Sequence, residues 1–262
     1  MKDLTTDKLK VVIYETRLQM GTEAAKDAAK KIRELLLSKQ GFVNIIFAAA
    51  PSQNEFLFSL SLEKDINWSR VNGFHMDEYV GINKIASQSF AYFLKENIFD
   101  KVPFNKVFYI NGDADDLSLE CNRYTKLLKE NPADIVCMGI GENTHIAFND
   151  PHTADFSDPL VVKVVTLDEA SRQQQVHDGC FAHLEDVPTS AITLTVPALL
   201  NANSIFCIAP GKNKAMAVFQ TINNEVSEIY PSTSLKNHVN AILYLDKESA
   251  SKLKMAVHKQ TY

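Results

Sequence analysis

The sequence has few cysteines, no long apolar run and no excess of basic residues, and each shortage excludes a class of protein. The four cysteines among its 262 residues are far apart and form no CxxC pair. Scattered thiols are typical of a reducing cytosol rather than of a disulfide framework. No apolar run reaches the roughly 18 residues that a transmembrane helix needs. The N-terminal MKDLTTDKLK has no apolar core behind its charges, so we do not expect a secretory signal.

The charge balance is slightly acidic, with 27 basic and 32 acidic side chains and a net charge of −5. Nucleic-acid affinity depends on the neutralisation of many phosphates, so a nucleic-acid partner is not expected, whereas a small local anion site is allowed. Apolar residues make up 45% and charged residues 23%, which excludes disorder, collagen and coiled coil. We expect a cytoplasmic globular protein with neither nucleic-acid nor membrane partners. A homo-oligomer remains open.

Strand and helix patterns alternate along the chain. The apolar runs 42–50 and 133–139 show no alternation, which suits strands that are buried on both faces of a parallel sheet. A helix is expected from an N-cap at Thr22 to about Gly41. Further strands are expected at 10–14, 71–76, 106–110, 161–165, 191–196, 204–208 and 241–245, and further helices at 56–62, 90–98 and 117–128 and from about Asp168, Lys212 and Lys247.

This alternation predicts an α/β fold, in which a three-layer, mostly parallel Rossmann-like sheet carries helices on both faces. No linker rich in Pro, Gly or Ser and no repeat divides the chain, so residues 1–262 are expected to form a single domain. Ligands of such sheets bind beyond the carboxyl ends of the strands. Polar clusters follow Ala50, Met76 and Gly139, and the chemistry is expected there.

The richest cluster is the stretch 139–150, GIGENTHIAFND. Gly141 permits a sharp turn, and His145 and Asp150 are close enough to pair through a bend. A carboxylate beside an imidazole fixes its tautomer and gives a proton shuttle near neutral pH. The alternative is a loop with a surface histidine and a capping aspartate. The third glycine of a dinucleotide fingerprint is absent.

Two acidic residues, Asp77 and Glu78, follow the strand at 71–76. A carboxylate that its neighbours partly desolvate can serve as a base, and the alternative is a turn or capping residue. His75 and Asp77 could also suggest a metal. A metal site needs three or more converging ligands, and no further ligand pattern appears nearby, so no metal is expected.

Three other positions suggest an anion site. Ser52 and Gln53 precede a helix, and a helix N-terminus with hydroxyl and amide side chains can bind an anion; an ordinary serine N-cap is the alternative. Lys214 stands in a first helical turn, where a lysine opposes the macrodipole unless it serves an anion. Arg172 could add a bidentate phosphate contact. A solvated lysine and a surface ion pair are the alternatives.

Together these segments resemble the glucosamine-6-phosphate deaminase family, within the wider group of sugar-phosphate isomerases and 6-phosphogluconolactonases. The similar segments are FHMDEYVGI at 74–82, SQSF at 87–90, GIGENTHIAFNDP at 139–151, TLTV at 193–196 and PGKNKA at 210–215. Their order and spacing fit as well. A lactonase typically lacks the first segment and carries a Gly-Pro-Asp-Gly-His type of loop instead.

The resemblance implies an enzyme that opens the ring of a hexosamine 6-phosphate and converts the sugar to fructose 6-phosphate and ammonia, without metal or organic cofactor, in amino-sugar and N-acetylglucosamine catabolism. Asp77 matches the base that moves a proton between C2 and C1. His145 matches the ring-opening acid/base, Asp150 the carboxylate that orients it, and Asn143 a position held by Asp or Asn. The expected substrate- and phosphate-binding residues are Ala50, Ser52, Gln53, Glu78, Gly141, Arg172 and Lys214.

Three departures from the family pattern leave alternatives open. Residues 48–54, AAAPSQN, replace a Gly/Thr-rich phosphate loop, and the phosphate-binding arginine of the family falls one helical turn after Arg172. Thr144 replaces a glycine, and a β-branched residue resists positive φ, so a shifted turn is expected. The alternatives are a 6-phosphogluconolactonase-like hydrolase and a catalytically weak regulator that binds a sugar phosphate.

Overall fold

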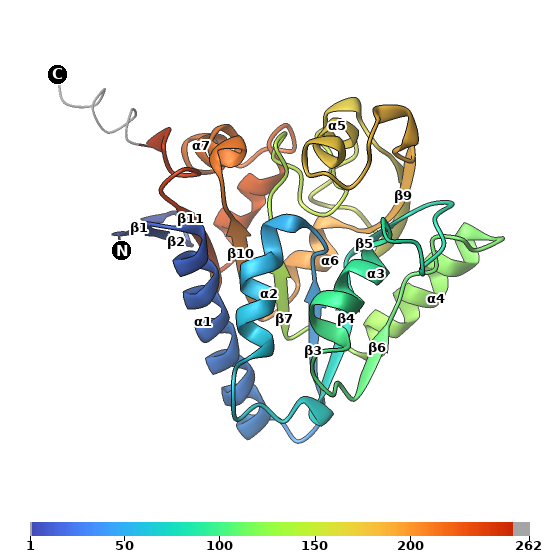
Figure 1. Cartoon of the computed structure of the whole chain (residues 1–262), viewed down its shortest axis with the longest axis horizontal. Helices are drawn as coiled ribbons and strands as arrows, with labels where there is room; N and C mark the ends of the chain where they lie inside the picture. The colour runs from blue at the N-terminus through green and yellow to red at the C-terminus, as the bar shows by residue number, and fades with distance from the viewer. Residues whose placement is uncertain (1, 254–262) are drawn as a thin grey trace.

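A computed structural model describes residues 2–253 (Figure 1). Its centre is an eight-stranded sheet in which every neighbouring pair is parallel except β1 and β2. The predicted mostly parallel α/β sheet is therefore confirmed. In spatial order the strands are β1 (Lys2–Thr6), β2 (Leu9–Tyr14), β11 (Ala241–Asp246), β10 (Ser204–Ala209), β7 (Ile135–Met138), β3 (Val43–Phe47), β4 (Val71–His75) and β6 (Lys106–Phe108).

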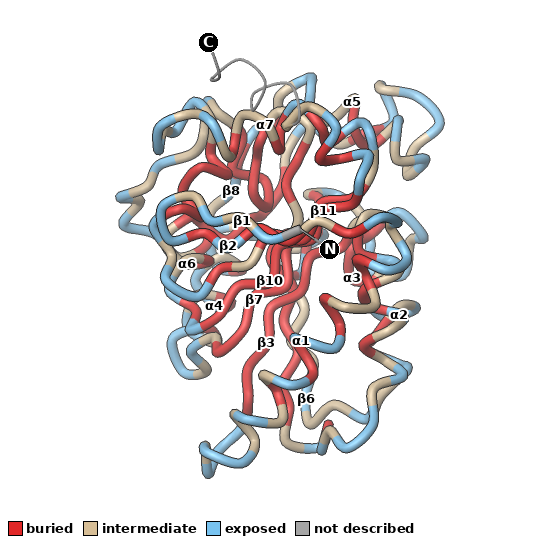
Figure 2. Tube along the Cα trace, turned by 90° about the vertical axis from the view of Figure 1, so that its left-hand side faces the viewer, coloured by how far each residue is buried: buried red, intermediate tan, exposed pale blue. Residues whose placement is uncertain are grey.

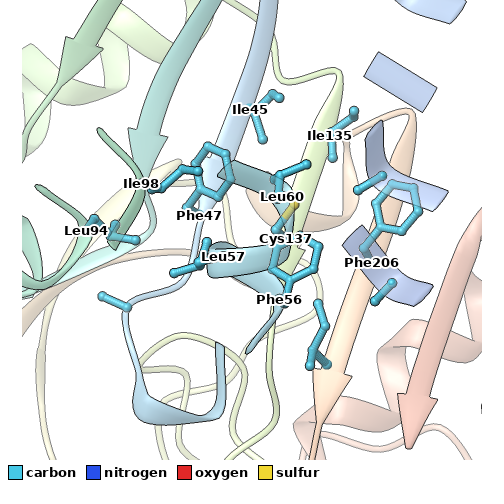
Figure 3. Packing of buried hydrophobic residues seen from close by; sticks show 14 of the residues in the cluster. Ile45, Phe47, Phe56, Leu57, Leu60, Leu94, Ile98, Ile135, Cys137 and Phe206 are labelled. Atoms are coloured by element: carbon cyan, nitrogen blue, oxygen red, sulfur yellow. The ribbon is translucent and has the colours of Figure 1, made fainter. Parts of the chain in front are cut away.

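Helices cover both faces of this sheet. Along β3, Ile45 and Phe47 join one buried cluster and Ile46 joins the other, because successive strand residues point to opposite faces. Figure 2 shows β3, β7 and β10 buried, and Figure 3 shows Phe47 beside Leu57 of α2. The first face carries α1 (Arg17–Ser38), α2 (Asn54–Ser61) and α3 (Phe90–Leu94), and the second α4 (Leu117–Glu130), α6 (Val196–Leu200) and α7 (Ala215–Asn223).

A second sheet of three antiparallel strands lies on the α4 side of the molecule. Its order is β5 (Asp77–Tyr79), β9 (Ser190–Leu194) and β8 (Val162–Thr166), and α4 contacts β8. The strands expected at 161–165 and 191–196 therefore exist but belong to this small sheet. The remaining helical segments are α5 (Glu169–His177), 3₁₀ turns at Pro51–Gln53, Trp68–Arg70, Leu184–Asp186, Lys212–Lys214 and Pro231–Asn237, and a π turn at Lys95–Phe99.

Two expected boundaries of the first helix are wrong. Thr16 is the N-cap of α1, since its hydroxyl accepts a hydrogen bond from the Gln19 N–H at 3.1 Å. Thr22 lies inside the helix, one residue after Gly21. A Cβ at Gly21 would come within 2.6 Å of the Glu55 Cβ, so the small residues here allow α2 to pack closely on α1. The helix ends at Ser38 rather than near Gly41.

The expected helix from Lys247 is also wrong at its start, because residues 247–252 form turns. The Asp246 carboxylate accepts hydrogen bonds from the Ser249 and Gly211 N–H groups, which turns the chain at the end of β11. The continuation of that helix after 253 lies outside the described residues. Within residues 2–253 no helix is long and apolar enough to cross a membrane. All four cysteines are free thiols.

The chain order of the strands reverses between β3 and β7. From β3 the sheet grows outward through β4 and β6, whereas β7 returns to the other side of β3 and leads on to β10 and β11. In open α/β sheets the crevice outside the carboxyl ends of the strands at such a reversal is where ligands bind. The topology therefore directs attention to the loops after β3, β4, β7 and β10.

Candidate active site

A pocket opens at the carboxyl ends of these four strands, and α5 forms one of its walls. All three polar clusters that the sequence singled out contribute to this pocket. The lining residues are Ala48, Ala49, Ala50, Ser52, Gln53, Met76, Asp77, Phe90, Gly139, Ile140, Gly141, His145, Ala147, Phe148, Gln174, Gln175 and Lys214.

The loop after β7 brings His145 to the pocket. It closes on itself, since the Gly141 N–H donates to the His145 carbonyl at 2.8 Å and the His145 N–H donates to the Asn143 side-chain oxygen at 3.1 Å. A Cβ at position 141 would lie 2.2 to 2.4 Å from three atoms of the imidazole ring. Glycine at 141 is therefore required for the ring to occupy its place.

Thr144 adopts the left-handed conformation that a β-branched residue usually avoids. Its φ is 72°, so Thr144 takes the positive φ that we expected it to resist. The surroundings hold the residue there: its side chain is fully buried, and its carbonyl accepts a hydrogen bond from the Ser232 N–H at 2.9 Å. Such a conformation costs roughly 1–2 kcal/mol for a non-glycine residue, which tertiary contacts offset.

Asp150 is completely buried beside the imidazole of His145. The distance from its Oδ1 to the His145 Nδ1 is 3.2 Å, and Asn143 donates to the same oxygen at 3.0 Å. Burial alone would raise the pKa of the Asp150 carboxyl. The hydrogen bond and charge of His145, with the hydrogen bonds from Ser171 and Asn143, instead hold this pKa below its usual range. Asp150 therefore stays ionised and orients the ring.

Asn143 acts on the loop and does not line the pocket. Its side-chain nitrogen donates to both Asp150 and Asp168 at 3.0 Å, while its oxygen accepts from the His145 backbone. The expected catalytic role is therefore corrected to a positioning role, because both ends of this amide are used within the protein.

Asp77 lies in the same pocket as His145. It is the first residue of β5, where the chain leaves the large sheet after β4 and joins the small one. Only 7% of the residue is exposed. Burial, with a further contribution from the charge of Glu78, raises the pKa of the Asp77 carboxyl well above its ordinary value. A carboxylate of raised pKa in a pocket has the basicity that proton abstraction needs.

The neighbours of Asp77 serve the fold. Glu78 is 1% exposed and accepts hydrogen bonds from the N–H groups of Tyr79, Phe90 and Ala91. Its expected substrate contact is wrong, since it caps the start of α3 and does not line the pocket. The Nε2 of His75 accepts from the Ile110 N–H at 2.8 Å, and burial lowers the His75 pKa to about 3, so this ring is neutral.

Lys214 supplies a buried positive charge to the pocket. It ends the 3₁₀ turn after β10 and is 3% exposed. Its ammonium group has no hydrogen-bond or ion-pair partner within the described residues, while its backbone N–H donates to the Gly211 carbonyl. Burial lowers its pKa, and the charges of Asp178 and Glu142 partly oppose this effect. A desolvated ammonium without a partner indicates that an anion belongs beside it.

Ser52 and Gln53 line the same pocket as Lys214. The Gln53 side-chain nitrogen donates to the Ile208 carbonyl at 3.2 Å and to the Ser52 hydroxyl at 3.1 Å. Gly139 permits this approach, because a Cβ there would lie 3.1 Å from that nitrogen. The loop at 51–54 contains no glycine. The glycine that makes room for its Gln53 side chain is Gly139, at the end of the neighbouring strand β7.

Arg172 does not reach the pocket, so the phosphate contact expected of it is wrong. Its guanidinium donates to the carbonyls of Leu184 and Val187, at 2.6 and 2.9 Å. It thereby attaches the 3₁₀ turn Leu184–Asp186 to α5. The reason is its direction on the helix: Arg172 follows Ser171 by one residue, about 100° round the helix, and so points away from the side on which Ser171 contacts His145.

Sequence reasoning missed three residues of α5. Ser171 contacts His145 and Asp150, and Gln174 and Gln175 line the pocket. A signal was present, since Asp168, Ser171 and Gln175 are polar and recur at spacings of three and four, which places them on one helical face. All three of the missed residues are buried.

One group of potential metal ligands lies near this network, made by Asp150, His152 and Asp168. Asp168 caps α5 through the Ser171 N–H at 2.6 Å, and Asp150 accepts from Ser171 and Asn143. Protein donors therefore already bond to both oxygens of each carboxylate. This arrangement serves His145 and α5 rather than an ion.

Comparison with known proteins gives consistent similarities. A family model described as glucosamine-6-phosphate isomerases/6-phosphogluconolactonase matches residues 15–244. The chain is 36% identical over 246 residues to a glucosamine-6-phosphate deaminase of Streptococcus sanguinis, which covers 94% of this chain and 100% of the relative. It is 35% identical to one of Bacillus cereus, with 92% and 90% covered.

Solved structures extend the similarity. A monomeric glucosamine-6-phosphate deaminase matches with a TM-score of 0.83 and 27% identity, over 92% of this chain and 98% of that one. A 6-phosphogluconolactonase from Trypanosoma cruzi matches with a TM-score of 0.76 and 17% identity, over 97% and 99%. The second match shows a shared fold alone.

Proposed function

The chain belongs to the family of glucosamine-6-phosphate isomerases and 6-phosphogluconolactonases, and we propose that it converts glucosamine 6-phosphate, or a closely related hexosamine 6-phosphate, and water to fructose 6-phosphate and ammonia. One observation carries this proposal. Asp77, His145 and the unpaired Lys214 line a single pocket, so a base, a ring-opening group and an anion-binding charge face one substrate.

The division of labour follows from the surroundings of each group. The His145 imidazole, held by Asp150, exchanges a proton with the ring oxygen as the sugar ring opens. The Asp77 carboxylate then takes the proton from C2 of the open chain and returns a proton to C1, through an enolamine. Loss of the amine as ammonia and addition of water at C2 give the ketose. Each proton transfer of this kind is worth about 10²–10⁴-fold in rate.

The phosphate of the substrate would lie against Lys214, Ser52 and Gln53. A buried, unpaired ammonium costs free energy that a bound dianion recovers. The Ser52 hydroxyl accepts from the Gln53 amide and keeps its own hydrogen to donate to the phosphate. We assign no phosphate contact to Arg172, because its guanidinium is already bonded to two carbonyls.

Hydrolysis of 6-phosphogluconolactone is the second candidate, since the fold is shared with lactonases. That reaction needs a base for water and a phosphate site, but no base beside a carbon acid. Asp77 lines the pocket, and its burial raises the pKa of its carboxyl, as a base for a carbon acid requires, so deamination accounts for one more feature of the pocket. A regulator that binds without turnover would need neither Asp77 nor the His145 network.

We place this activity in cytoplasmic amino-sugar catabolism. The four free thiols support a reducing compartment. A single functional unit is supported by the pocket itself, because its lining residues range from Ala48 to Lys214.

The test is ammonia release from glucosamine 6-phosphate, with galactosamine 6-phosphate and 6-phosphogluconolactone assayed alongside. Asp77→Asn should lower deamination by about 10²–10⁴-fold, because the amide cannot accept the C2 proton. Asp115→Asn, at an exposed position outside the pocket, is the matched control and should be unchanged. If ammonia release survives in Asp77→Asn, or if only the lactone is turned over, the proposal is wrong.

A further inference from the structure

We propose that Ser171 is a positioning residue that fixes the tautomer and direction of the His145 ring by bridging it to Asp150. The proposal rests on the proposed function, because it assigns a role within the same reaction. The Ser171 hydroxyl lies 2.8 Å from the His145 Nδ1 and makes a short hydrogen bond with Oδ1 of Asp150. All three side chains are buried.

The donor in each contact follows from what each group can offer. Asp150 is ionised, because its pKa is held below the usual range, and a carboxylate only accepts hydrogen bonds. The single hydrogen of the Ser171 hydroxyl therefore points to Asp150. The hydroxyl oxygen is then left as an acceptor, and the His145 Nδ1 must donate to it.

This arrangement of donors and acceptors also determines the protonation of Nε2, the other nitrogen of the ring. A neutral imidazole carries one hydrogen, so with the hydrogen on Nδ1 the Nε2 is free to take a proton. Nε2 has no hydrogen-bond partner among residues 2–253, and His145 lines the pocket. The ring thus presents its basic nitrogen to substrate. Asp150 alone lies farther from Nδ1, at 3.2 Å, and does not define the ring plane as well.

Ser171 is itself held firmly in this position. It stands in the first turn of α5, where its N–H donates to Asp168. Asp168 accepts a hydrogen bond from the side chain of Asn143, in the loop after β7. Gln174, one turn later, accepts a hydrogen bond from the Glu142 N–H at 2.8 Å. Asp168, Ser171 and Gln174 therefore all join the segment of α5 to the loop. Ser171 is the one of the three that contacts His145.

The charged groups around the ring come from several elements. Asp150 follows the loop after β7, and Asp168 precedes α5. Asp77 of β5 and Lys214 after β10 line the same pocket as His145, and Glu142 stands on the same loop. Among them only Asp150 contacts the ring, so removal of Ser171 acts chiefly on the His145–Asp150 pair.

The test is Ser171→Ala, with Ser234→Ala as matched control. Ser234 is equally buried, and its hydroxyl donates to the Pro231 carbonyl, outside the pocket. We expect kcat of Ser171→Ala to fall about 10- to 100-fold with KM nearly unchanged, since a misdirected ring loses its productive orientation. In ¹⁵N NMR, His145 of the wild type should be the Nδ1–H tautomer, and Ser171→Ala should show a mixture of tautomers.

The outcomes separate this inference from the proposed function. An unchanged kcat overturns it, and so does a lower kcat with an unchanged His145 tautomer in ¹⁵N NMR, because that result indicates a structural effect alone. If the wild type releases no ammonia but the NMR change occurs in Ser171→Ala, the positioning role stands and the proposed reaction fails.

Discussion

Single atoms decide whether the imidazole of His145 can occupy its place. The imidazole lies directly against Gly141, and because glycine has a hydrogen in place of a side chain, the ring has enough space there. Gly139 likewise leaves space for the side-chain amide of Gln53, although a Cβ at position 139 would be less crowded than one at position 141. The two glycines of the GIG motif therefore shape the walls of the pocket.

Gly141→Ala should lower kcat about 10²-fold, because displacement of a catalytic ring by about 1 Å is enough for such a loss. The crowding should also reduce the free energy of unfolding by about 1–3 kcal/mol. Steady-state ammonia release and urea unfolding measure the two effects. Gly41→Ala is the control, since no atom lies within 4 Å of its added Cβ. An active Gly141→Ala enzyme would contradict the packing described for His145.

The pH dependence follows from Asp77. The base works in its ionised form, and burial together with Glu78 raises its pKa. Activity is therefore lost as the pH falls, and the loss should begin at a higher pH than for an ordinary carboxyl with a pKa near about 4. A profile of kcat/KM from pH 4 to 9 measures this limb. A limb at the ordinary carboxyl value, or a flat profile, would exclude Asp77 as the base.

Residues that stand in a local motif were predictable from sequence, because their position depends on a few neighbours. Asp77 follows its strand directly, and His145 and Asp150 belong to one loop. Arg172 was misassigned because its direction depends on where the chain at 184–187 returns to α5, a contact twelve or more residues away. Glu78 was misassigned because its partners, Phe90 and Ala91, come from the next helix.

At the scale of helices and strands, local capping chemistry sets the boundaries. The side chain of Asp116 accepts hydrogen bonds from the Ser118 and Leu119 N–H groups at 2.9 and 3.0 Å, and Asp168 caps α5 in the same way. Both helix starts were expected to within a residue or two. Thr22 misled the prediction for α1, since Thr16 offers the same chemistry six residues earlier.

Asp116→Ala should lower the free energy of unfolding by about 1 kcal/mol, because two N–H groups at the start of α4 lose their acceptor. Deamination should be unaffected, since Asp116 does not line the pocket. Chemical denaturation followed by circular dichroism measures the change. Asp115→Ala, one residue earlier and exposed without a capping bond, should leave stability as it is; equal losses in both variants would argue against the cap.

The small antiparallel sheet could not be predicted from periodicity. The segment of β5 is three residues long and reads as a turn after β4, while β8 and β9 look like further strands of the large sheet. Their pairing is decided by tertiary packing, where the side chain of Thr193 opposite Asp77 accepts a hydrogen bond from the Phe148 N–H at 3.0 Å. This sheet carries Asp77 away from β4 and toward the pocket.

At the scale of the whole molecule, one apolar core on each face of the large sheet supports the pocket. Phe47, the last residue of β3, is fully buried and packs edge-on against Phe99 and Phe104. It stands directly before the wall residues 48–50. The core therefore continues into the floor of the active site.

Phe47→Ala should reduce the free energy of unfolding by about 3–5 kcal/mol through lost burial and the cavity left behind. Phe58→Ala is the matched control on α2, where the ring is 63% exposed, and should change stability by less than about 1 kcal/mol. Urea denaturation of both proteins makes the comparison. Similar losses would mean that the first core does not carry the sheet as described.

The active-site residues are scattered over most of the polypeptide, from Ala48 after β3 to Lys214 after β10. During synthesis, a nascent chain that has reached residue 200 already contains Asp77 and His145. It still lacks Lys214 and β10, the strand that precedes this lysine. Turnover therefore requires the completed sheet, and in a refolding experiment ammonia release should return together with the whole fold and not before it.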